Sequence, residues 1–313
     1  MIPYEWINSA EIRIADYIKH TPVSFDCDLG VYFKWENKQT TGSFKVRGAI
    51  NRVLLLEPWE KSQGLVTASA GNHGQGVALA GQLIETKAIV FVSNHAVPSK
   101  VDAMKVLGAE IHEVKGGYGL SEKTAIEYSH KNNATYISPY NDPQIIAGQG
   151  TIGLEVINDI KLDEPVTWVV PVGGGGLISG LGVVKRANNI RGKLIGIQPE
   201  SSPFTHALFH LGSQEGIVDN PTLADGLSGP MQEGSITLSI INNLVDDIFT
   251  VSEMEIKQAI SYAWHKHGEI IEGSAAVSIA AVLFGKVKSP ALVIITGGNI
   301  QRETHLQIIE ELK

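Results

Sequence analysis

The sequence is poor in cysteine, in basic charge and in long apolar runs. Its 313 residues include one cysteine, Cys27, which excludes an internal disulfide and a cysteine-rich metal cluster and is typical of a reducing compartment. Acidic residues outnumber basic ones by 33 to 25, which argues against binding along a nucleic-acid backbone. The longest uncharged apolar stretch, residues 275–284, is too short to cross about 30 Å of hydrocarbon. The first twenty residues show no signal-peptide pattern. We therefore expect a cytoplasmic protein that acts on a small molecule, with neither nucleic acid nor membrane as a partner.

Glycine, by contrast, is abundant. The chain has 33 glycines, a larger share than the typical value of about 7 %. They gather at residues 71–76, 148–153, 173–176 and 297–298. Where glycines follow an apolar strand, backbone amides can approach a ligand closely. These clusters are therefore the first places to look for a binding site.

Short β-branched runs alternate with longer amphipathic ones, a pattern typical of an α/β protein with parallel sheets. The predicted strands fall into two series, which are Gly64–Ala68, Ala88–Ser93, Glu110–Val114 and Thr135–Ser138, then Val166–Val172, Leu194–Gln198, Asp247–Val251 and Ala291–Thr296. Predicted helices include Asn72–Leu83, Ser99–Leu107, Leu120–Asn132 and Ser252–His267, the last opened by a capping box of Ser252 and Glu255. Two series of strands predict two open, mostly parallel sheets in two lobes. We expect a small domain over residues 49–145 and a large domain formed by residues 1–48 and 146–313.

The first segment with chemical potential surrounds Lys45. A strand over Val31–Glu36 leads into a polar turn, and we expect a helix to begin near Ser43 as its N-cap. Lys45 then lies in the first helical turn, where the helix dipole disfavours a cation, and Arg47 adds a second positive charge nearby. Both effects lower the pKa of Lys45 and favour its neutral, nucleophilic amine. The alternative is an ordinary solvated surface lysine.

Three further segments join strands to helices or loops. Residues 67–76 place small side chains at a strand–helix turn, which suits an anion such as a carboxylate or is simply a tight turn. At residues 169–180 a buried strand leads to four consecutive glycines and a helix, which favours a phosphate site, although neither the Walker nor the dinucleotide motif is present. At residues 294–299, Thr296 and two glycines end a strand, where a planar ring could approach.

One segment imitates a dinucleotide-binding motif. Residues 148–153 match G-x-G-x-x-G letter for letter. A loop with Pro139 and Pro143 precedes this segment, whereas the motif requires a strand there. We interpret the segment as a close-packed helix and do not expect a nicotinamide cofactor.

These segments, in this order, resemble the fold-type II pyridoxal-phosphate enzymes, in particular the threonine and serine dehydratases and serine racemase. The resemblance extends from about Thr21 to Asn299. It rests on TGSFK at 41–45, SAGNH at 69–73, AGQGT at 147–151, PVGGGG at 171–176 and ADG at 224–226. Together and in register, these matches are specific.

The resemblance implies a role for each site residue. Lys45 is the lysine that forms a Schiff base with pyridoxal 5'-phosphate, and Phe44 packs beside it. Asn72 donates to the phenolic oxygen of the cofactor, Thr296 faces its pyridine nitrogen, and Gly226 lies near its rim. The phosphate is held by Gly173, Gly174, Gly175, Gly176 and Leu177. The substrate and its carboxylate are bound by Ser69, Ala70, Gly71, Asn72 and His73. Glu272 matches a family segment near the ring, without an assigned role.

The implied activity is β-elimination of a β-hydroxy amino acid, L-threonine or L-serine, to a 2-keto acid and ammonia. Alternatives are a dehydratase for 3-hydroxyaspartate or another substituted serine, a serine racemase, and a non-catalytic B6-binding protein. Serine racemases carry a serine where this chain has Ala70, so racemisation is expected to be poor. Their divalent-cation ligands fall at Gln198 and Phe204, so we expect no metal there. The resemblance also implies a homodimer. Few residues follow Asn299, so inhibition by isoleucine through a C-terminal domain is not expected.

Overall fold

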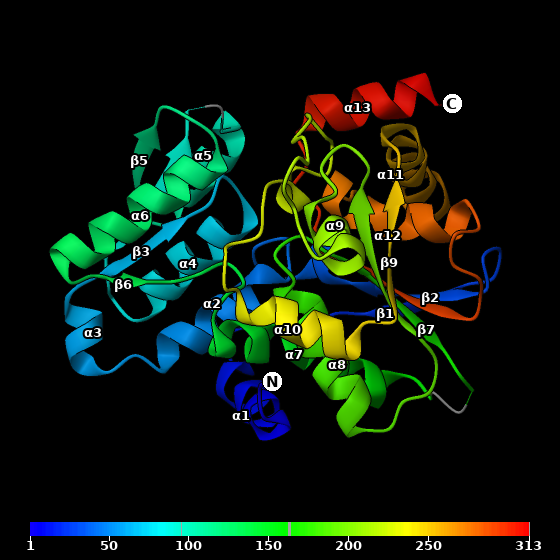
Figure 1. Cartoon of the computed structure of the whole chain (residues 1–313), viewed down its shortest axis with the longest axis horizontal. Coiled ribbons are helices and arrows are strands. Elements are labelled where there is room, and N and C mark those ends of the chain that lie inside the picture. The colour runs from blue at the N-terminus through cyan, green and yellow to red at the C-terminus, as the bar shows by residue number, and fades with distance from the viewer. Residues whose placement is uncertain (95, 162–163, 313) are drawn as a thin grey trace.

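Two β-sheets with helices on both faces make up the protein (Figure 1). The computed structural model describes residues 1–94, 96–161 and 164–312. Within this part of the chain, no helix is long and apolar enough to span a membrane.

The larger sheet has six strands and contains both early and late parts of the chain. Its strand order is β1 (Val23–Asp26), β2 (Val31–Trp35), β10 (Ala291–Ile295), β7 (Thr167–Pro171), β8 (Leu194–Pro199) and β9 (Asp247–Val251). Neighbouring strands are parallel except β1, which is antiparallel to β2. In the register of β10, Val293 pairs with Phe33 on one side and with Val169 on the other. Strand β10 thus joins the N-terminal strands to the middle of the chain.

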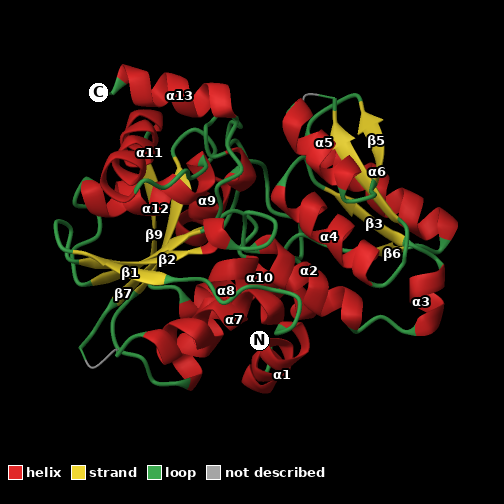
Figure 2. Cartoon of the chain, turned by 180° about the vertical axis from the view of Figure 1, so that it is seen from behind, coloured by secondary structure: helices red, strands yellow, loops and turns green. Residues whose placement is uncertain are grey.

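Helices cover both faces of the larger sheet (Figure 2). Alternating side chains of its strands belong to the core cluster of one or the other helical layer. Val169 and Val293 belong to the apolar cluster of α11 (Glu253–His267) and α12 (Gly273–Leu283). Trp168 and Ile294, their neighbours in the same two strands, belong to the cluster of α7 (Pro143–Asp159) and α8 (Gly176–Ala187). A sheet buried on both faces explains why its strands read as continuous apolar runs.

The smaller sheet has four parallel strands from one stretch of sequence. Its order is β5 (Glu110–Val114), β4 (Ala88–Ser93), β3 (Leu65–Ala68) and β6 (Thr135–Tyr136). Helices α4 (Asn72–Leu83) and α5 (Pro98–Val106) share an apolar cluster with one face, and α6 (Tyr118–Asn132) shares one with the other. The remaining helices are α1 (Tyr4–Ile14), α2 (Lys45–Leu54), α3 (Pro58–Ser62), α9 (Phe204–Leu211), α10 (Ile236–Leu244) and α13 (Arg302–Glu311), with 3-10 turns η1 (Glu36–Lys38) and η2 (Asp225–Leu227).

The predicted fold class is confirmed, and several predicted elements agree closely. Strands β4, β5 and β9 and helix α4 have the predicted bounds, and the capping box of Ser252 and Glu255 is present. The strand predicted over Val31–Glu36 is β2, which ends at Trp35 because Glu36 begins a 3-10 turn. Strand β6 ends at Tyr136, two residues before its predicted end. No observation tests the boundaries that we predicted for the two domains.

The G-x-G-x-x-G segment lies inside α7, where its glycines permit close helix packing. A Cβ at Gly148 would lie 2.6 Å from the Cα of Gly48 in α2, and a Cβ at Gly150 would lie 2.8 Å from the Ile7 side chain in α1. Helix α7 therefore packs against the backbone of α2 and against the Ile7 side chain of α1. The interpretation of this segment as a close-packed helix is confirmed.

The replacement Gly148→Ala tests this contact. We expect it to lower the free energy of unfolding by about 1–3 kcal/mol, because the new methyl group must push α2 and α7 apart. Urea denaturation monitored by circular dichroism measures the effect. Gly119→Ala is the matched control, because Gly119 also lies in a helix but has open space around it, so alanine is expected to be neutral or stabilising. Equal stability of the two variants would contradict the packing argument.

Candidate active site

A cavity of about 330 Å³ lies where strands of both sheets end. Its lining includes Thr296 after β10, Gly173 after β7 and Ser69 after β3. Ligands of open α/β sheets bind at such carboxyl ends of strands. Every residue predicted for the site lines this cavity, namely Phe44, Lys45, Ser69, Ala70, Gly71, Asn72, His73, Gly173, Gly174, Gly175, Gly176, Leu177, Gly226 and Thr296. The structure thus brings together segments that are up to about 250 residues apart in the chain.

Lys45 is the first residue of α2, and its amine faces the cavity. Its Nζ donates a hydrogen bond to the Pro139 carbonyl at 3.0 Å and lies 5.2 Å from the centroid of the Phe44 ring. Burial lowers the pKa of Lys45 to about 8, against the attraction of Glu272, which raises it. A lysine with a lowered pKa holds a larger share of neutral, nucleophilic amine than a surface lysine does.

The predicted N-cap of this helix is wrong. The N-cap residue is Phe44, and no side chain caps the helix. The backbone of Ser43 pairs with Gly297 in an isolated β-bridge, and the Phe44 amide donates to the Thr296 carbonyl at 3.1 Å. These bonds hold the residues before Lys45 against the end of β10. The helix therefore begins one residue later than a serine cap at position 43 would allow.

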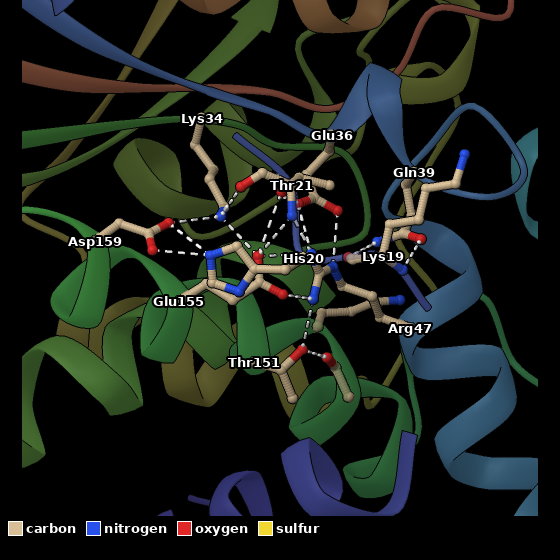
Figure 3. Close-up of polar contacts among 12 residues, drawn as sticks. Lys19, His20, Thr21, Lys34, Glu36, Gln39, Arg47, Thr151, Glu155 and Asp159 are labelled. Atoms are coloured by element: carbon tan, nitrogen blue, oxygen red, sulfur yellow. Dashed lines mark hydrogen bonds and ion pairs between the residues drawn. The ribbon is translucent and has the colours of Figure 1, made fainter. Parts of the chain in front are cut away.

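The contribution expected from Arg47 to the pKa of Lys45 is also wrong. Arg47 is fully buried and turned into an ion-pair network with Glu36 and Glu155 (Figure 3). Its Nε lies 2.7 Å from Glu36 Oε2, and its Nη1 lies 2.6 Å from Glu155 Oε1. Burial disfavours the guanidinium, but the two carboxylates outweigh it and raise the pKa of Arg47. Its charge is thus matched locally, and the burial of Lys45 itself lowers the pKa of the lysine.

The same network joins α2 to the larger sheet and to α7. Lys34 of β2 lies 2.6 Å from Glu155 Oε2 and donates to the Thr21 carbonyl at 2.6 Å. Both cations are fully buried and paired with carboxylates from other elements. Loss of one partner in such a network costs about 3–5 kcal/mol, because it leaves a buried charge without compensation. The beginning of α2, and with it Lys45, is therefore held firmly in place.

The four glycines at 173–176 form the turn between β7 and α8. Gly175 is the N-cap of α8 with φ +83°, a conformation that favours glycine. A Cβ at Gly174 would lie 2.3 Å from the Tyr140 ring, and a Cβ at Gly175 would lie 2.5 Å from Ile241. The first amides of a helix have no acceptor within the helix. In α8 these amides belong to residues that line the cavity. This arrangement suits an anion with several oxygens, such as a phosphate.

Thr296 follows β10 directly and lines the cavity. The residue is buried, and its Oγ1 has no hydrogen-bond partner among the described residues. A buried hydroxyl without a partner costs free energy unless a ligand or water completes it. Its position agrees with the predicted contact to a ring nitrogen, which remains a prediction.

The turn before α4 places Ser69, Ala70, Gly71, Asn72 and His73 along one wall. The Gly71 amide donates to Ser69 Oγ at 3.2 Å, and the first turn of α4 begins at Asn72. Burial and the charge of Lys45 lower the pKa of His73 to about 3, so its ring is neutral. His73 Nε2 lies 3.1 Å from the Ile137 carbonyl, which makes this nitrogen the protonated one. Attraction of a carboxylate to this wall must therefore come from the amides and not from the imidazole.

Glu272 is a buried acidic residue of the cavity, and the sequence assigned it no role. It precedes α12, is buried, and its Oε1 accepts a hydrogen bond from Asn72 Nδ2 at 2.7 Å. Burial raises the pKa of Glu272 to about 7; Asp225 raises it further, whereas Lys100, the Asn72 bond and Lys45 lower it. A Cβ at Gly297 would lie 2.6 Å from Glu272 Oε1, so this glycine makes room for the carboxyl group. Glu272 can therefore exist in both protonation states near neutral pH.

An ion pair between Lys100 and Asp225 lies at the cavity and joins a helix beside the smaller sheet to a 3-10 turn outside it. Lys100 of α5 lies 2.5 Å from Asp225 of η2, and both residues line the cavity. Sequence reasoning missed this pair. The partners are 125 residues apart. Asp225 lies in the ADG segment that carries the family resemblance, but nothing in the sequence pairs it with Lys100.

The positions at which racemases are expected to bind a divalent cation are occupied by other contacts. Gln198 Oε1 accepts a hydrogen bond from the His206 amide at 2.9 Å, and the Phe204 side chain is buried. Among the described residues, no group of three or more histidine, cysteine or acidic side chains is arranged to hold a metal ion.

The replacement Glu272→Gln tests the electrostatic coupling inside the cavity. We expect the pKa of Lys45 to fall below about 8, because the ionised Glu272 carboxylate favours the ammonium form and the amide does not. NMR titration of the reductively ¹³C-methylated lysines in protein without bound ligand measures this pKa. Glu269→Gln is the control, because Glu269 pairs with Lys38 and does not line the cavity. An unchanged or higher pKa in Glu272→Gln would refute the coupling.

Comparisons with known proteins agree with the observed fold. The family model described as pyridoxal-phosphate dependent enzyme matches residues 14–297. L-threonine ammonia-lyase of Thermotoga maritima is 39 % identical over 309 residues, which are 96 % of this chain and 76 % of the relative. The catabolic L-threonine dehydratase TdcB of Escherichia coli is 37 % identical over 90 % of this chain and 86 % of its own. The structure of maize serine racemase superposes with a TM-score of 0.89 at 30 % identity, covering 99 % of this chain and 97 % of that one. The family model matches most of the chain, and a lysine, a glycine turn and a threonine hydroxyl lie around one cavity. The chain therefore belongs to the family of pyridoxal-phosphate dependent enzymes.

Proposed function

We propose that the protein is an amino-acid ammonia-lyase that removes the β-hydroxyl group and the amino group from L-threonine or L-serine. The observation that carries the proposal is the position of the Lys45 amine, which shares one cavity with the glycine turn of α8 and the Thr296 hydroxyl. The names of the relatives support threonine, since an ammonia-lyase and a dehydratase for L-threonine are 39 % and 37 % identical to this chain.

The residues around the cavity fit pyridoxal 5'-phosphate. Thr296 offers a buried hydroxyl without a partner among the described residues, and the glycine turn leaves no room for side chains between it and Tyr140 or Ile241. Lys45 offers an amine whose pKa is lowered to about 8. A volume of about 330 Å³ lies within the usual range for small-molecule and cofactor sites.

We assign the cofactor contacts accordingly. Lys45 is the attachment point and Phe44 packs against the ring, while Asn72, Thr296 and Gly226 border the ring. The amides of the α8 turn hold the phosphate, with Gly173, Gly174, Gly175, Gly176 and Leu177 as its residues. Ser69, Ala70, Gly71, Asn72 and His73 form the substrate wall, where the amides at the start of α4 bind the carboxylate.

Bound pyridoxal 5'-phosphate would supply an aldehyde for the substrate amine and a conjugated ring for the electrons of the Cα–H bond. The chain supplies the base: Lys45 Nζ, in its neutral form, accepts the α-proton. The Pro139 carbonyl keeps this nitrogen in place through its hydrogen bond of 3.0 Å. His73 holds its proton on Nε2 against the Ile137 carbonyl and therefore does not donate it to the substrate.

We expect elimination to be favoured over racemisation because of the residue at position 70. Position 70, which carries serine in racemases, is Ala70 here, and a methyl group cannot return a proton to Cα. Racemisation of serine is the second candidate activity, and the structural likeness to maize serine racemase supports it.

The charges of the cavity favour a neutral β-substituent. The cationic side chains of its described lining are Lys45 and Lys100, and Asp225 already pairs with Lys100. A second substrate carboxylate, as in 3-hydroxyaspartate, would have to break this pair. L-Threonine and L-serine make no such demand.

We further propose that the enzyme works as a homodimer in the cytoplasm on a free amino acid, with no nucleic acid as a partner. One exposed cysteine and a net charge of −8 support the compartment and the absence of a nucleic-acid partner. The small domain of residues 49–145 and the large domain of 1–48 and 146–313 are the proposed units, since β3 to β6 all lie within the first and the six-stranded sheet within the second.

A substrate panel tests the activity. We expect 2-keto acid and ammonia from L-threonine and L-serine, with slower turnover of 3-hydroxyaspartate and little D-serine from L-serine. Coupled keto-acid assays and chiral chromatography of the remaining amino acid give these rates. Lys45→Ala is expected to lower kcat by at least about 10²-fold, because the proton acceptor is lost. A protein that takes up the cofactor but releases no keto acid from any of these substrates would be a B6-binding protein instead.

Chelation tests the metal prediction. We expect EDTA treatment followed by gel filtration to leave the ammonia-lyase rate unchanged, because Gln198 and Phe204 do not present the oxygen ligands that Mg²⁺ and Ca²⁺ prefer. Addition of either ion should not raise the rate. Loss of activity with EDTA and recovery with Mg²⁺ would show that the prediction is wrong.

A further inference from the structure

The side chain of Asn299 connects the Lys45 segment with the substrate wall. It lies four residues after the end of β10, and its Nδ2 makes two hydrogen bonds. One goes to the Thr41 carbonyl at 2.9 Å and the other to Asn72 Oδ1 at 2.7 Å. These acceptors are 258 and 227 residues away in the chain, and sequence analysis assigned Asn299 no role.

The Thr41 carbonyl decides which way both amides point. A backbone carbonyl can only accept, so the Asn299 atom that faces it is the nitrogen. This nitrogen carries two hydrogens, and the second requires an acceptor, so the Asn72 atom that faces it is the oxygen. The Asn72 nitrogen then points the other way and donates to Glu272 Oε1 at 2.7 Å.

These contacts leave one hydrogen of the Asn72 side-chain amide without an acceptor among the described residues. Glu272 is the acceptor for the first hydrogen of Asn72 Nδ2, and the described residues offer no acceptor for the second. Asn72 lines the cavity, so the second hydrogen is available to a ligand there. A reversed amide would present an acceptor in its place.

Asn299 also fixes the turn that leads to Lys45. A Cβ at Gly42 would lie 2.6 Å from Asn299 Oδ1, and Gly42 has φ +71°. The Gly298 amide donates to the Gly42 carbonyl at 2.9 Å. The loop after β10 and the loop before α2 therefore form one tightly packed unit.

We propose that Asn299 is a positioning residue that makes Asn72 a hydrogen-bond donor toward the cofactor. The inference rests on the proposed function, which places the phenolic oxygen of pyridoxal 5'-phosphate beside Asn72. The direction is transmitted from the Thr41 carbonyl through Asn299 to Asn72, and Glu272 accepts at the far end. Asn299 itself does not line the cavity.

The decisive variant is Asn299→Asp, which keeps the shape and removes both donors. The carboxylate at position 299 carries only acceptors, so the Asn72 amide must reverse to donate to it, and Asn72 Oδ1 then faces the cavity. We expect the affinity of the protein for pyridoxal 5'-phosphate to fall about tenfold or more. We also expect the visible absorption and fluorescence bands of the bound cofactor to shift, because its phenolic oxygen loses a donor. Asn299→Ala should weaken binding less, since Glu272 still holds the Asn72 nitrogen.

The double variant Asn299→Asp with Glu272→Gln separates direction from stability. The reversed Asn72 amide is then fully bonded, because the new amide at 272 donates to Asn72 Oδ1 and the new carboxylate at 299 accepts from Asn72 Nδ2. A merely structural network should recover both thermal stability and cofactor affinity. Our proposal requires that stability recovers relative to Asn299→Asp while affinity and spectrum stay impaired.

Asn37→Asp is the matched control, because Asn37 also donates to a backbone carbonyl, that of Ile270, and has no contact with Asn72. It should bind the cofactor as the wild type does, with the wild-type spectrum. Wild-type affinity and spectrum in Asn299→Asp would overturn the inference; if that variant does not fold, the same result in Asn299→Ala would overturn it. Failure of the wild type itself to take up pyridoxal 5'-phosphate would overturn the proposed function together with this inference, whereas uptake that is insensitive to Asn299 refutes the inference alone.

Discussion

The site depends on the close crossing of α2 and α7 and on the buried ion pairs that secure it. Glycines at positions 48 and 148 let the two backbones meet, and Arg47 then reaches Glu36 and Glu155 without exposure to water. A charge buried in this way has few alternative positions, because each departure leaves a partner uncompensated. Lys45 lies two residues before Arg47 in the same helix, so the ion pairs of Arg47 also hold the backbone of Lys45 in place. The reactive amine is thus placed by residues that never touch a ligand.

Local sequence patterns account for most of the fold. Strands such as Ala88–Ser93 and Asp247–Val251 were predictable to the residue, because β-branched runs between polar turns leave little choice. The start of α2 was not, because the bridge between Ser43 and Gly297 overrides the capping preference of serine. The role of Arg47 could not be predicted either. Its partners come from a 3-10 turn and another helix, and their approach depends on packing that no local pattern encodes.

The candidate site likewise has features that can be predicted from the sequence and features that cannot. Its glycine turns and its lysine carry motifs that can be recognised in the sequence, and all of them line one cavity. The contacts that tune it are long-range: Asn72 with Glu272, and Lys100 with Asp225, join residues 200 and 125 positions apart. Such pairs follow from how two sheets are set against each other. A single sequence marks the segments of Asn72 and Asp225 but holds no signal for these pairings, because nothing local indicates which residues meet.

The place of β10 in the larger sheet has a consequence for biosynthesis. Residues 291–295 lie between β2 and β7, so no strand joins the two halves of this sheet until these residues have left the ribosome. Until then β2 and β7 each present an unpaired edge, the kind of surface that promotes aggregation and that chaperones shield. Thr296, which lines the cavity, follows β10 directly, so the strand that closes the sheet also brings this residue to the pocket. We therefore expect the vitamin to bind only after these residues have been synthesised.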